Sequence, residues 1–258
     1  MAKNKVKEML RSGRTAIGSW ISICDAFSVE AMGGQGFDWL LIDTEHSPIG
    51  REGLRNILVA LKGSESLPVV RLTSNSADYF KMALDLGAQG IVVPMIESSD
   101  DASRAVEYCR YPPAGKRGIG PVRASNYFRE LDKYLEEAND EILLVAQIET
   151  TRSVQNLEAI LEVKGIDGIF IGPADLAGSM GMARQVGHPE VTKVIDHVAA
   201  TARRLGRPFG LPTWSPEELV TYTKSGATLP LLGGDLRFLM DGAQQNLERA
   251  RSLLTAKR

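Results

Sequence analysis

Eight short apolar runs, each followed by a longer amphipathic segment, constrain the fold of this sequence more than any other feature. The runs are rich in Val, Ile and Leu, which is typical of parallel strands that are buried on both faces and alternate with helices. They occupy residues 16–23, 39–43, 68–72, 90–95, 142–149, 168–172, 208–212 and 228–233. An open, doubly wound sheet could use the same alternation, but eight units in 258 residues favour a closed barrel. We therefore predict an α/β fold with one (β/α)8 TIM barrel domain over residues 1–258.

The segments between these runs carry the residues that begin and end helices. Ser215, Pro216 and Glu218 predict an N-cap with a capping box, and Ser98 predicts a second helix start. Glycines are expected to follow helices at positions 63, 87, 165, 206 and 226. One interval is longer than the others, because a loop at 111–128 precedes an amphipathic stretch at 129–140, which predicts an additional helix.

Composition and charge argue against several classes of protein. A formal net charge of −2 does not favour nucleic acid as a partner, since phosphate-binding surfaces usually show a basic excess. Cys24 and Cys109 lie far apart and form no CxxC, so neither a disulfide framework nor a cysteine zinc site is expected. No signal peptide and no apolar stretch of about 18 residues is evident. These features predict a soluble cytoplasmic protein with no membrane partner.

Polar residues at the ends of the predicted strands mark the candidate site, because barrels of this kind place their active sites at the carboxyl ends of the strands. Glu149 and Asp175 follow neighbouring strands, so their carboxylates should repel one another unless a proton or cation lies between them. Oxygen ligands point to Mg²⁺, Mn²⁺ or Co²⁺. The alternative is structural, with Glu149 capping the next helix and Asp175 starting a turn. The two carboxylates together favour the metal.

Two further polar residues lie at the same end of the predicted barrel. Arg71 closes the third strand, where its guanidinium needs an anionic partner, either a substrate or a structural ion pair with Glu45 or Glu149. His46 follows the second strand and is placed for general acid or base work. The other histidines, at positions 188 and 197, are expected to be structural or at the surface.

Glycine-rich and lysine residues help to separate the possible chemistries. The segments 115–120 and 232–235 could bind phosphate, although flexible turns are the default for both, since neither matches a known phosphate-binding fingerprint. No lysine lies in or at the carboxyl end of a predicted strand, which counts against a Schiff-base aldolase. A metal-dependent route is therefore preferred.

Several motifs together resemble the HpcH/HpaI aldolase family of class II pyruvate aldolases, typified by 4-hydroxy-2-oxoheptanedioate aldolase. The resemblance covers residues from about 15 to 240, and its motifs are FDWLLIDTEHSP, PVVRL, LGAQGIVVPMIESSDDA, YPPAGKRGIG, QIET and GIFIGPADL. It implies a barrel of the phosphoenolpyruvate/pyruvate type. It also implies that Glu149 and Asp175 bind the metal, that Arg71 holds pyruvate and stabilises its enolate, and that His46 is the acid/base residue.

The resemblance implies supporting roles and an assembly as well. Gln147 and the backbone amide of Ala174 would help to hold the substrate, and Asp43 would support the water shell of the metal. Asp85 would pair with His46 of a neighbouring subunit. Family members are typically homohexamers that exchange a C-terminal helix, which corresponds here to about 235–255. Gly172 and Trp20 complete the predicted substrate contacts.

Two loops depart from the family pattern, around Thr213–Trp214 and Gly233–Asp235. They lie where the aldehyde half of the substrate is expected, so the aldehyde is left open. The predicted reaction is the reversible cleavage of a 4-hydroxy-2-oxo acid to pyruvate and an aldehyde. The alternatives are oxaloacetate decarboxylation or macrophomate-synthase-like enolate chemistry at the same site, and a barrel that binds a sugar phosphate.

Overall fold

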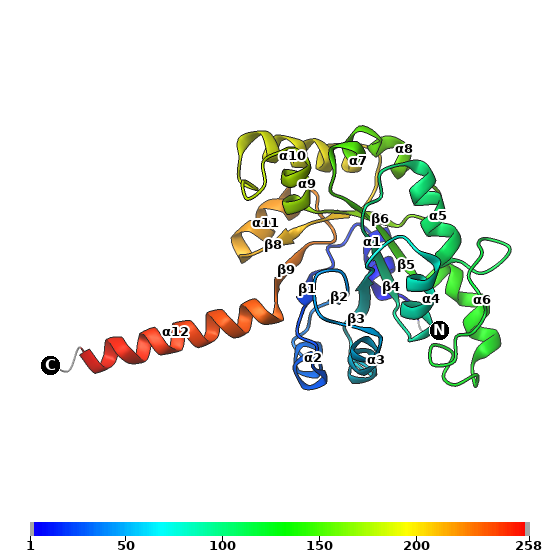
Figure 1. Ribbon diagram of the computed structural model, residues 1–258, viewed down its shortest axis with the longest axis horizontal. Coiled ribbons are helices and arrows are strands. Elements are labelled where there is room, and N and C mark those ends of the chain that lie inside the picture. The colour runs from blue at the N-terminus through cyan, green and yellow to red at the C-terminus, as the bar shows by residue number, and fades with distance from the viewer. Residues whose placement is uncertain (1–2, 256–258) are drawn as a thin grey trace.

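Nine parallel strands form one sheet that closes into a barrel in the computed structural model, which describes residues 3–255 (Figure 1). The strands are β1 (Gly18–Ile21), β2 (Trp39–Asp43), β3 (Leu67–Arg71), β4 (Gly90–Val93), β5 (Leu143–Ile148), β6 (Gly168–Ile171), β7 (Phe209–Gly210), β8 (Pro212–Thr213) and β9 (Leu231–Gly234). Their order around the sheet is β7-β6-β5-β4-β3-β2-β1-β9-β8. The predicted barrel fold is confirmed.

The ring closes through a seventh strand that is divided into two short pieces. β7 pairs with β6, and β8 pairs with β9, so the predicted strand at 208–212 is interrupted at Leu211 but still fills one position of an eight-position barrel. Gly210 is required at this bend, since a Cβ atom there would lie 1.8 Å from the carbonyl oxygen of Leu229. The predicted strand at 228–233 begins late, at Leu231, because the amides of Thr228 and Leu229 both donate to the carbonyl of Phe209.

Twelve helices alternate with the strands within residues 3–255. They are α1 (Lys5–Arg11), α2 (Ala26–Gly33), α3 (Arg51–Ala60), α4 (Ala77–Asp85), α5 (Ser99–Cys109), α6 (Leu131–Glu141), α7 (Thr151–Gln155), α8 (Leu157–Leu161), α9 (Pro173–Ser179), α10 (Pro189–Arg204), α11 (Pro216–Lys224) and α12 (Asp235–Thr255). The additional helix predicted at 129–140 is α6. Glycines 63, 87, 165, 206 and 226 all have positive φ, as predicted for residues that follow helices.

The predicted capping box at α11 is only half correct. Ser215 caps the helix by accepting from the amide of Glu218, but the Glu218 side chain accepts from the amide of Trp214 instead of that of Ser215. Ser98 caps α5 as predicted, accepting from the amide of Asp101. The displaced Glu218 contact fixes the loop before α11, which becomes a wall of the cavity described below.

The core has two layers, one inside the barrel and one between the strands and the surrounding helices. The inner layer includes Trp39, Val69, Val145 and Phe170, which are fully or almost fully buried. α1 covers its lower end, because Asn4 donates to carbonyls that lie just before β4 and β5. Sequence analysis missed this seven-residue helix, which is too short to show a clear period.

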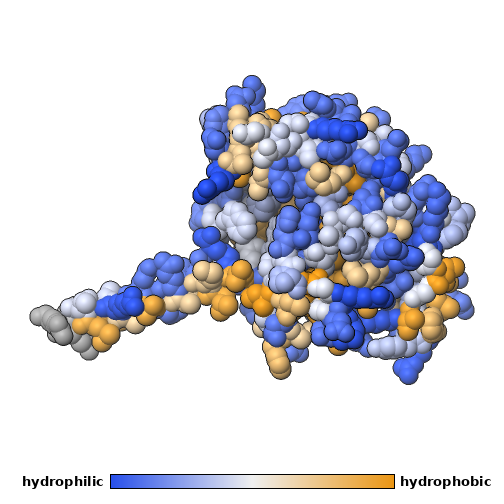
Figure 2. Space-filling model, in the orientation of Figure 1, coloured by the Kyte–Doolittle hydropathy of each residue, from blue (hydrophilic) through white to orange (hydrophobic). Residues whose placement is uncertain are grey.

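α12 leaves the barrel as a straight arm of 21 residues (Figure 1). Within this helix only Asp235 is buried, and apolar side chains along it are exposed, as the orange atoms on the arm in Figure 2 show. The exposed ones are Leu236, Phe238, Leu239, Met240, Leu247, Leu253 and Leu254. No helix within residues 3–255 is long and apolar enough to cross a lipid bilayer.

Candidate active site

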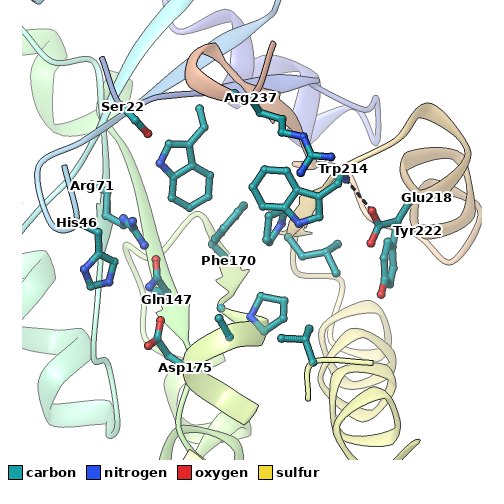
Figure 3. Close-up of a pocket in the computed structure, with 18 of the residues that line it drawn as sticks. Ser22, His46, Arg71, Gln147, Phe170, Asp175, Trp214, Glu218, Tyr222 and Arg237 are labelled. Carbon is teal, nitrogen blue, oxygen red and sulfur yellow. Dashed lines mark hydrogen bonds between the residues drawn. The ribbon is translucent and has the colours of Figure 1, made fainter. Parts of the chain in front are cut away.

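A cavity of about 760 Å³ opens over the carboxyl ends of the barrel strands (Figure 3). The residues that line it come from seven strands or the loops that follow them, and they include most of the predicted site: Trp20, His46, Arg71, Gln147, Gly172, Ala174 and Asp175. No lysine lines this cavity within the described residues. The structure therefore brings these predicted residues together in a place without an amine nucleophile.

Glu149 lies just beneath the cavity, where only 2% of its surface is exposed. One carboxylate oxygen, Oε1, accepts a hydrogen bond of 2.7 Å from the amide of Met95, and Oε2 accepts from Nε2 of Gln147. Burial, with a further contribution from the carboxylate of Asp175, raises the pKa of Glu149 above its ordinary value, and the two hydrogen bonds oppose this rise. A positive charge beside Glu149 would offset that energetic cost.

Gly172 allows this arrangement, since a Cβ atom at position 172 would lie 2.9 Å from Cβ of Glu149 and 3.0 Å from its Oε2. Any larger residue would displace the Glu149 carboxylate. Glu149 does not cap the next helix, so the structural alternative for this residue is wrong; Thr150 and Ser153 form the capping box of α7 instead. The Glu149 carboxylate therefore plays no part in starting α7.

The oxygen atoms around Glu149 and Asp175 fit a hard divalent cation. Asp175 lies in the first turn of α9, is exposed, and makes no hydrogen bond or ion pair to another residue within 3–255. The Oε1 atom of Gln147 is buried and also lacks a hydrogen-bond partner there. No group of three or more His, Cys, Asp or Glu side chains suited to a metal occurs in the described chain. Two protein carboxylates would therefore have to share the ion with water and substrate.

Arg71 is held by a carboxylate on the neighbouring strand. Asp43 and Arg71 occupy paired positions of β2 and β3, and Nε and Nη2 of Arg71 donate to the two oxygens of Asp43 at 3.0 and 2.7 Å. The guanidinium also lies over the Trp20 ring, 4.6 Å from its centroid, and the Trp20 indole donates to Asp43. Arg71 is thus fixed as a planar fork while it still lines the cavity.

Asp43 therefore anchors other residues of the site. It accepts from Arg71, from Trp20 and from the backbone amides of Glu45 and His46. Burial alone would raise its pKa, but the hydrogen bonds and positive charge of Arg71 outweigh burial and lower the pKa below the ordinary value. Asp43 remains ionised and orients the loop that carries His46.

Glu45 was not predicted to have an unusual environment. Its Oε2 atom lies 3.2 Å from Nη1 of Arg71, as the structural alternative for Arg71 proposed, yet the geometry gives that oxygen no hydrogen bond. Burial, reinforced by the charges of Glu149 and Asp43, raises the pKa of Glu45 to about 7 even though Arg71 and His46 lower it. The site therefore contains a carboxyl group that titrates near neutral pH.

His46 reaches the mouth of the cavity with 60% of its side chain exposed, and its Nε2 lies 4.0 Å from Oε2 of Glu45. The other two histidines are placed as predicted. His188 caps α10 by accepting from the amide of Glu190, and His197 is an exposed residue of that helix. Within residues 3–255, His46 is the histidine that lines the cavity.

Asp85 lies elsewhere. It is at the end of α4, is ion-paired with Arg117 at 2.7 Å, and lines a second cavity whose other charged residues include Arg51, Lys81 and Arg123. The structure does not bring Asp85 to His46 within one chain. α4 lies on the outside of the barrel, so Asp85 at its end is away from the cavity that contains His46. Sequence spacing alone does not show this.

The candidate phosphate site after β9 is occupied by a side chain of the protein. Asp235 accepts from the amides of Ser22, Ile23 and Leu236, which are the donors that a phosphate would need. Gly234 and Asp235 line the same cavity as Arg71, whereas residues 115–120 do not. This arrangement weakens the sugar-phosphate alternative.

Sequence analysis missed the residues that complete the site. Met95 follows β4, has a positive φ of 55° and donates its amide to Glu149. Trp214, in one of the loops that departed from the family pattern, and Arg237, in the first turn of α12, line the outer half of the cavity.

Comparison with known proteins identifies relatives across the whole barrel. The family model described as HpcH/HpaI aldolase/citrate lyase matches residues 16–241. A 4-hydroxy-2-oxo-heptane-1,7-dioate aldolase of Salmonella dublin is 41% identical over 244 residues, or 94% of this chain and 92% of the relative. A crystal structure of a protein of the same family from Burkholderia cenocepacia J2315 has a TM-score of 0.93 and 33% identity, and covers 96% of this chain and all of that one.

A structure of macrophomate synthase, at 23% identity and a TM-score of 0.87, covers 98% of this chain and 90% of its own, and shares the fold. The family match spans every strand of the barrel and all the cavity residues discussed above. The chain therefore belongs to the HpcH/HpaI aldolase/citrate lyase family.

Proposed function

We propose that the protein is a metal-dependent aldolase that cleaves and forms 4-hydroxy-2-oxo acids through the enolate of pyruvate. The observation that carries this proposal is the pair of carboxylates, Glu149 and Asp175, beside the fixed guanidinium of Arg71 in a cavity that no lysine lines within residues 3–255. The name of the Salmonella relative, an aldolase for a seven-carbon 2-oxo diacid, supports the same reaction class.

Arg71 provides the anion-binding group for the 2-oxo acid. Its fork is oriented by Asp43 and Trp20 before any substrate arrives, so little conformational entropy is lost when it binds a carboxylate or an enolate oxygen. The amide of Ala174 lies in the first turn of α9, where backbone N–H groups have no partner in the helix, and it can donate to the substrate. Gln147 lines the same cavity and donates to Glu149.

Glu149 and Asp175 would hold the ion, with Mg²⁺, Mn²⁺ and Co²⁺ as the candidates. A bound divalent cation supplies Lewis acidity, which stabilises negative charge on the oxygen of the 2-oxo group. The protein contributes the orientation of the Glu149 carboxylate, through the Met95 amide, Gln147 and the absence of a side chain at Gly172. The effect of such fixed groups on a developing oxyanion is about 3 kcal/mol or more in a water-poor site.

His46 moves the proton of the 4-hydroxyl group. Its exposed ring lies at the cavity mouth, so a water molecule can connect it to the substrate, and Glu45 beside it titrates near pH 7. We include Asp85 as the partner of His46 from a neighbouring subunit. Asp85 does not line the active-site cavity of its own chain. It lines the second cavity, and its Oδ1 accepts a hydrogen bond from Arg117.

We propose a homo-oligomer, with a hexamer as the expected state. The support is α12, a helix along which apolar side chains such as Leu239, Leu247 and Leu253 are exposed, which is typical of a surface that packs on another copy. Cys24 and Cys109 are free thiols, which supports a cytoplasmic location.

The direct test is product analysis. The wild-type enzyme should release pyruvate and an aldehyde from a 4-hydroxy-2-oxo acid when Mg²⁺, Mn²⁺ or Co²⁺ is present, and a chelator should stop the release. Glu149→Gln and Asp175→Asn should both be inactive with any of these metals. Undiminished cleavage in the presence of the chelator would contradict the proposal. Oxaloacetate should be assayed in parallel, because preferential decarboxylation would indicate the alternative use of the same enolate site.

A further inference from the structure

Asp85 is held by an arginine that is completely buried. The side chain of Arg117 has no exposed surface, whereas that of Asp85 is 27% exposed at the second cavity. Nη2 of Arg117 donates to Oδ1 of Asp85 at 2.7 Å and to the hydroxyl of Tyr134 at 3.3 Å. The guanidinium also lies over the ring of Tyr111, 4.4 Å from its centroid. These contacts fix Arg117 in one position behind Asp85.

The glycine-rich segment 115–120, which was considered as a phosphate loop, carries Arg117 to this place. The backbone amide of Arg117 donates to the carbonyl oxygen of Arg110 at 2.9 Å, directly after α5. A Cβ atom at Gly115 would clash with the same oxygen, so the segment can pack against the end of α5 only with glycine there. The segment thus places a buried cation beside Asp85.

The Arg117–Asp85 pair is a poor arrangement for stability alone. Nε and Nη1 of Arg117 are buried without a hydrogen-bond partner within residues 3–255. A buried donor without an acceptor is costly, and apolar side chains can often replace a buried ion pair without loss of stability. The pair is also one-sided, because Asp85 uses one oxygen, whereas Asp43 uses both oxygens toward Arg71. The geometry therefore suits a task other than holding the fold together.

The second oxygen of Asp85, Oδ2, accepts no hydrogen bond from the described residues. It lies on the side of Gly120, where it would be 3.8 Å from a Cβ atom, and both residues line the second cavity. Two cations of this cavity are engaged elsewhere, since Lys81 pairs with Asp78 at 3.6 Å and Arg123 donates to two backbone carbonyls. Asp85 thus presents one free carboxylate oxygen to the second cavity, in an orientation set by Arg117.

We propose that Arg117 is a positioning residue for the active site of a neighbouring subunit: it holds Asp85 by one oxygen so that the other can accept a hydrogen bond from the partner subunit's His46. This inference rests on the proposed function, in which Asp85 acts across a subunit interface, and adds the residue that prepares Asp85 for that role. His46 can receive such a partner, because 60% of its side chain is exposed. A fixed carboxylate orients the imidazole ring and selects its tautomer for proton transfer.

Mixing of subunits tests this inference with the metal-loaded full-length enzyme and 4-hydroxy-2-oxopentanoate, the adduct of pyruvate and acetaldehyde. Arg117→Gln, Asp85→Asn and His46→Ala should each lower kcat for cleavage about tenfold or more, with little change in KM, because each impairs proton transfer. Oligomers co-expressed from equal amounts of Arg117→Gln and His46→Ala chains should recover activity. In random assembly about one site in four combines an intact His46 with an intact Arg117–Asp85 pair, so about a quarter of the wild-type kcat is expected.

The matched control is the mixture of Arg117→Gln with Asp85→Asn. Both changes affect the same side of the interface, so no site regains an intact pair and no recovery is expected. Light scattering verifies that each variant assembles as the wild type does. If Arg117→Gln does not assemble, the same mixtures are made with Arg117→Lys, which keeps the buried charge but loses the planar fork that sets the direction of Asp85.

Recovery with His46→Ala, and none with Asp85→Asn, supports the inference. Wild-type kcat in the Arg117 variant overturns it. It is also overturned if Asp85→Asn recovers activity with His46→Ala but the Arg117 variant does not, because Arg117 would then act within its own subunit or on the fold alone. Failure of both mixtures overturns it together with the role of Asp85 across the interface, and leaves metal-dependent cleavage by the wild type standing. Absence of that cleavage would overturn the proposed function itself.

Discussion

Replacing Glu45 with Gln should stabilise the protein much more at pH 8 than at pH 5. Burial and nearby carboxylates raise the pKa of Glu45 to about 7 in the folded state, from an ordinary value of 4.5. Between these two values the folded protein binds more protons than the unfolded chain, so the free energy of unfolding falls as pH rises. Above about pH 7 the folded protein has lost all of the stability that depends on this group. Below pH 4.5 none of that stability is lost.

The magnitude follows from the two pKa values. A tenfold change in a proton-binding constant corresponds to about 1.4 kcal/mol, so the wild-type protein should lose about 2.5 kcal/mol from this one group between pH 5 and pH 8. Gln resembles the protonated form of Glu45 and cannot ionise. The difference in stability between Glu45→Gln and wild type should therefore grow by roughly that amount over the same interval.

The assay is urea unfolding of both proteins at pH 5 and pH 8, at one protein concentration and with a chelator present. Other groups also titrate in this range, but they are common to both proteins and cancel in the difference. A control variant, Glu65→Gln, removes a carboxyl group far from the cavity and should show no such trend. A difference between Glu45→Gln and wild type that stays constant within about 0.5 kcal/mol from pH 5 to pH 8 would refute the reasoning.

Four further substitutions test separate parts of the structure. Arg71→Lys loses the planar fork that Asp43 orients, so proton exchange of pyruvate, followed by NMR, should fall at least about tenfold. Gly172→Ala should displace the Glu149 carboxylate and weaken metal binding by about 10- to 100-fold in a calorimetric titration, with little change in Tm. Gly210→Ala places a Cβ atom 1.8 Å from a carbonyl oxygen and should destabilise the fold by about 1–3 kcal/mol in urea unfolding. Leu239→Glu, on the exposed apolar side of α12, should lower the mass measured by light scattering if that helix packs on another copy.

The barrel could be predicted from the sequence because its strands are buried and its helices are amphipathic, so the two kinds of segment differ in period. The strand at 39–43 was located to the residue, and the C-terminal helix at 235–255 has the predicted bounds. The split of the seventh strand could not be predicted, since it depends on the contact of Gly210 with Leu229, two segments that are adjacent only in the folded barrel.

The site was predicted to the extent that it depends on which residues end the strands. Glu149, Asp175, Arg71 and His46 all follow from that rule, and all lie in or directly beneath one cavity. The partners of these residues did not follow from it. The register of β2 against β3 pairs Asp43 with Arg71, and the Met95 amide that holds Glu149 depends on a backbone angle. Neither leaves a signal in residue type or spacing.

Proton exchange at the methyl group of pyruvate, followed by NMR in deuterated water, is the most direct test of Glu149 and Asp175 as the metal-binding pair. No aldehyde is needed, so the result depends only on the proposed enolate site. Rapid exchange is expected with wild-type enzyme and Mg²⁺, Mn²⁺ or Co²⁺, none with a chelator, and none in Glu149→Gln at any metal concentration. Exchange that persists in Glu149→Gln with the chelator present would contradict the assignment of Glu149 and Asp175 as the metal-binding pair.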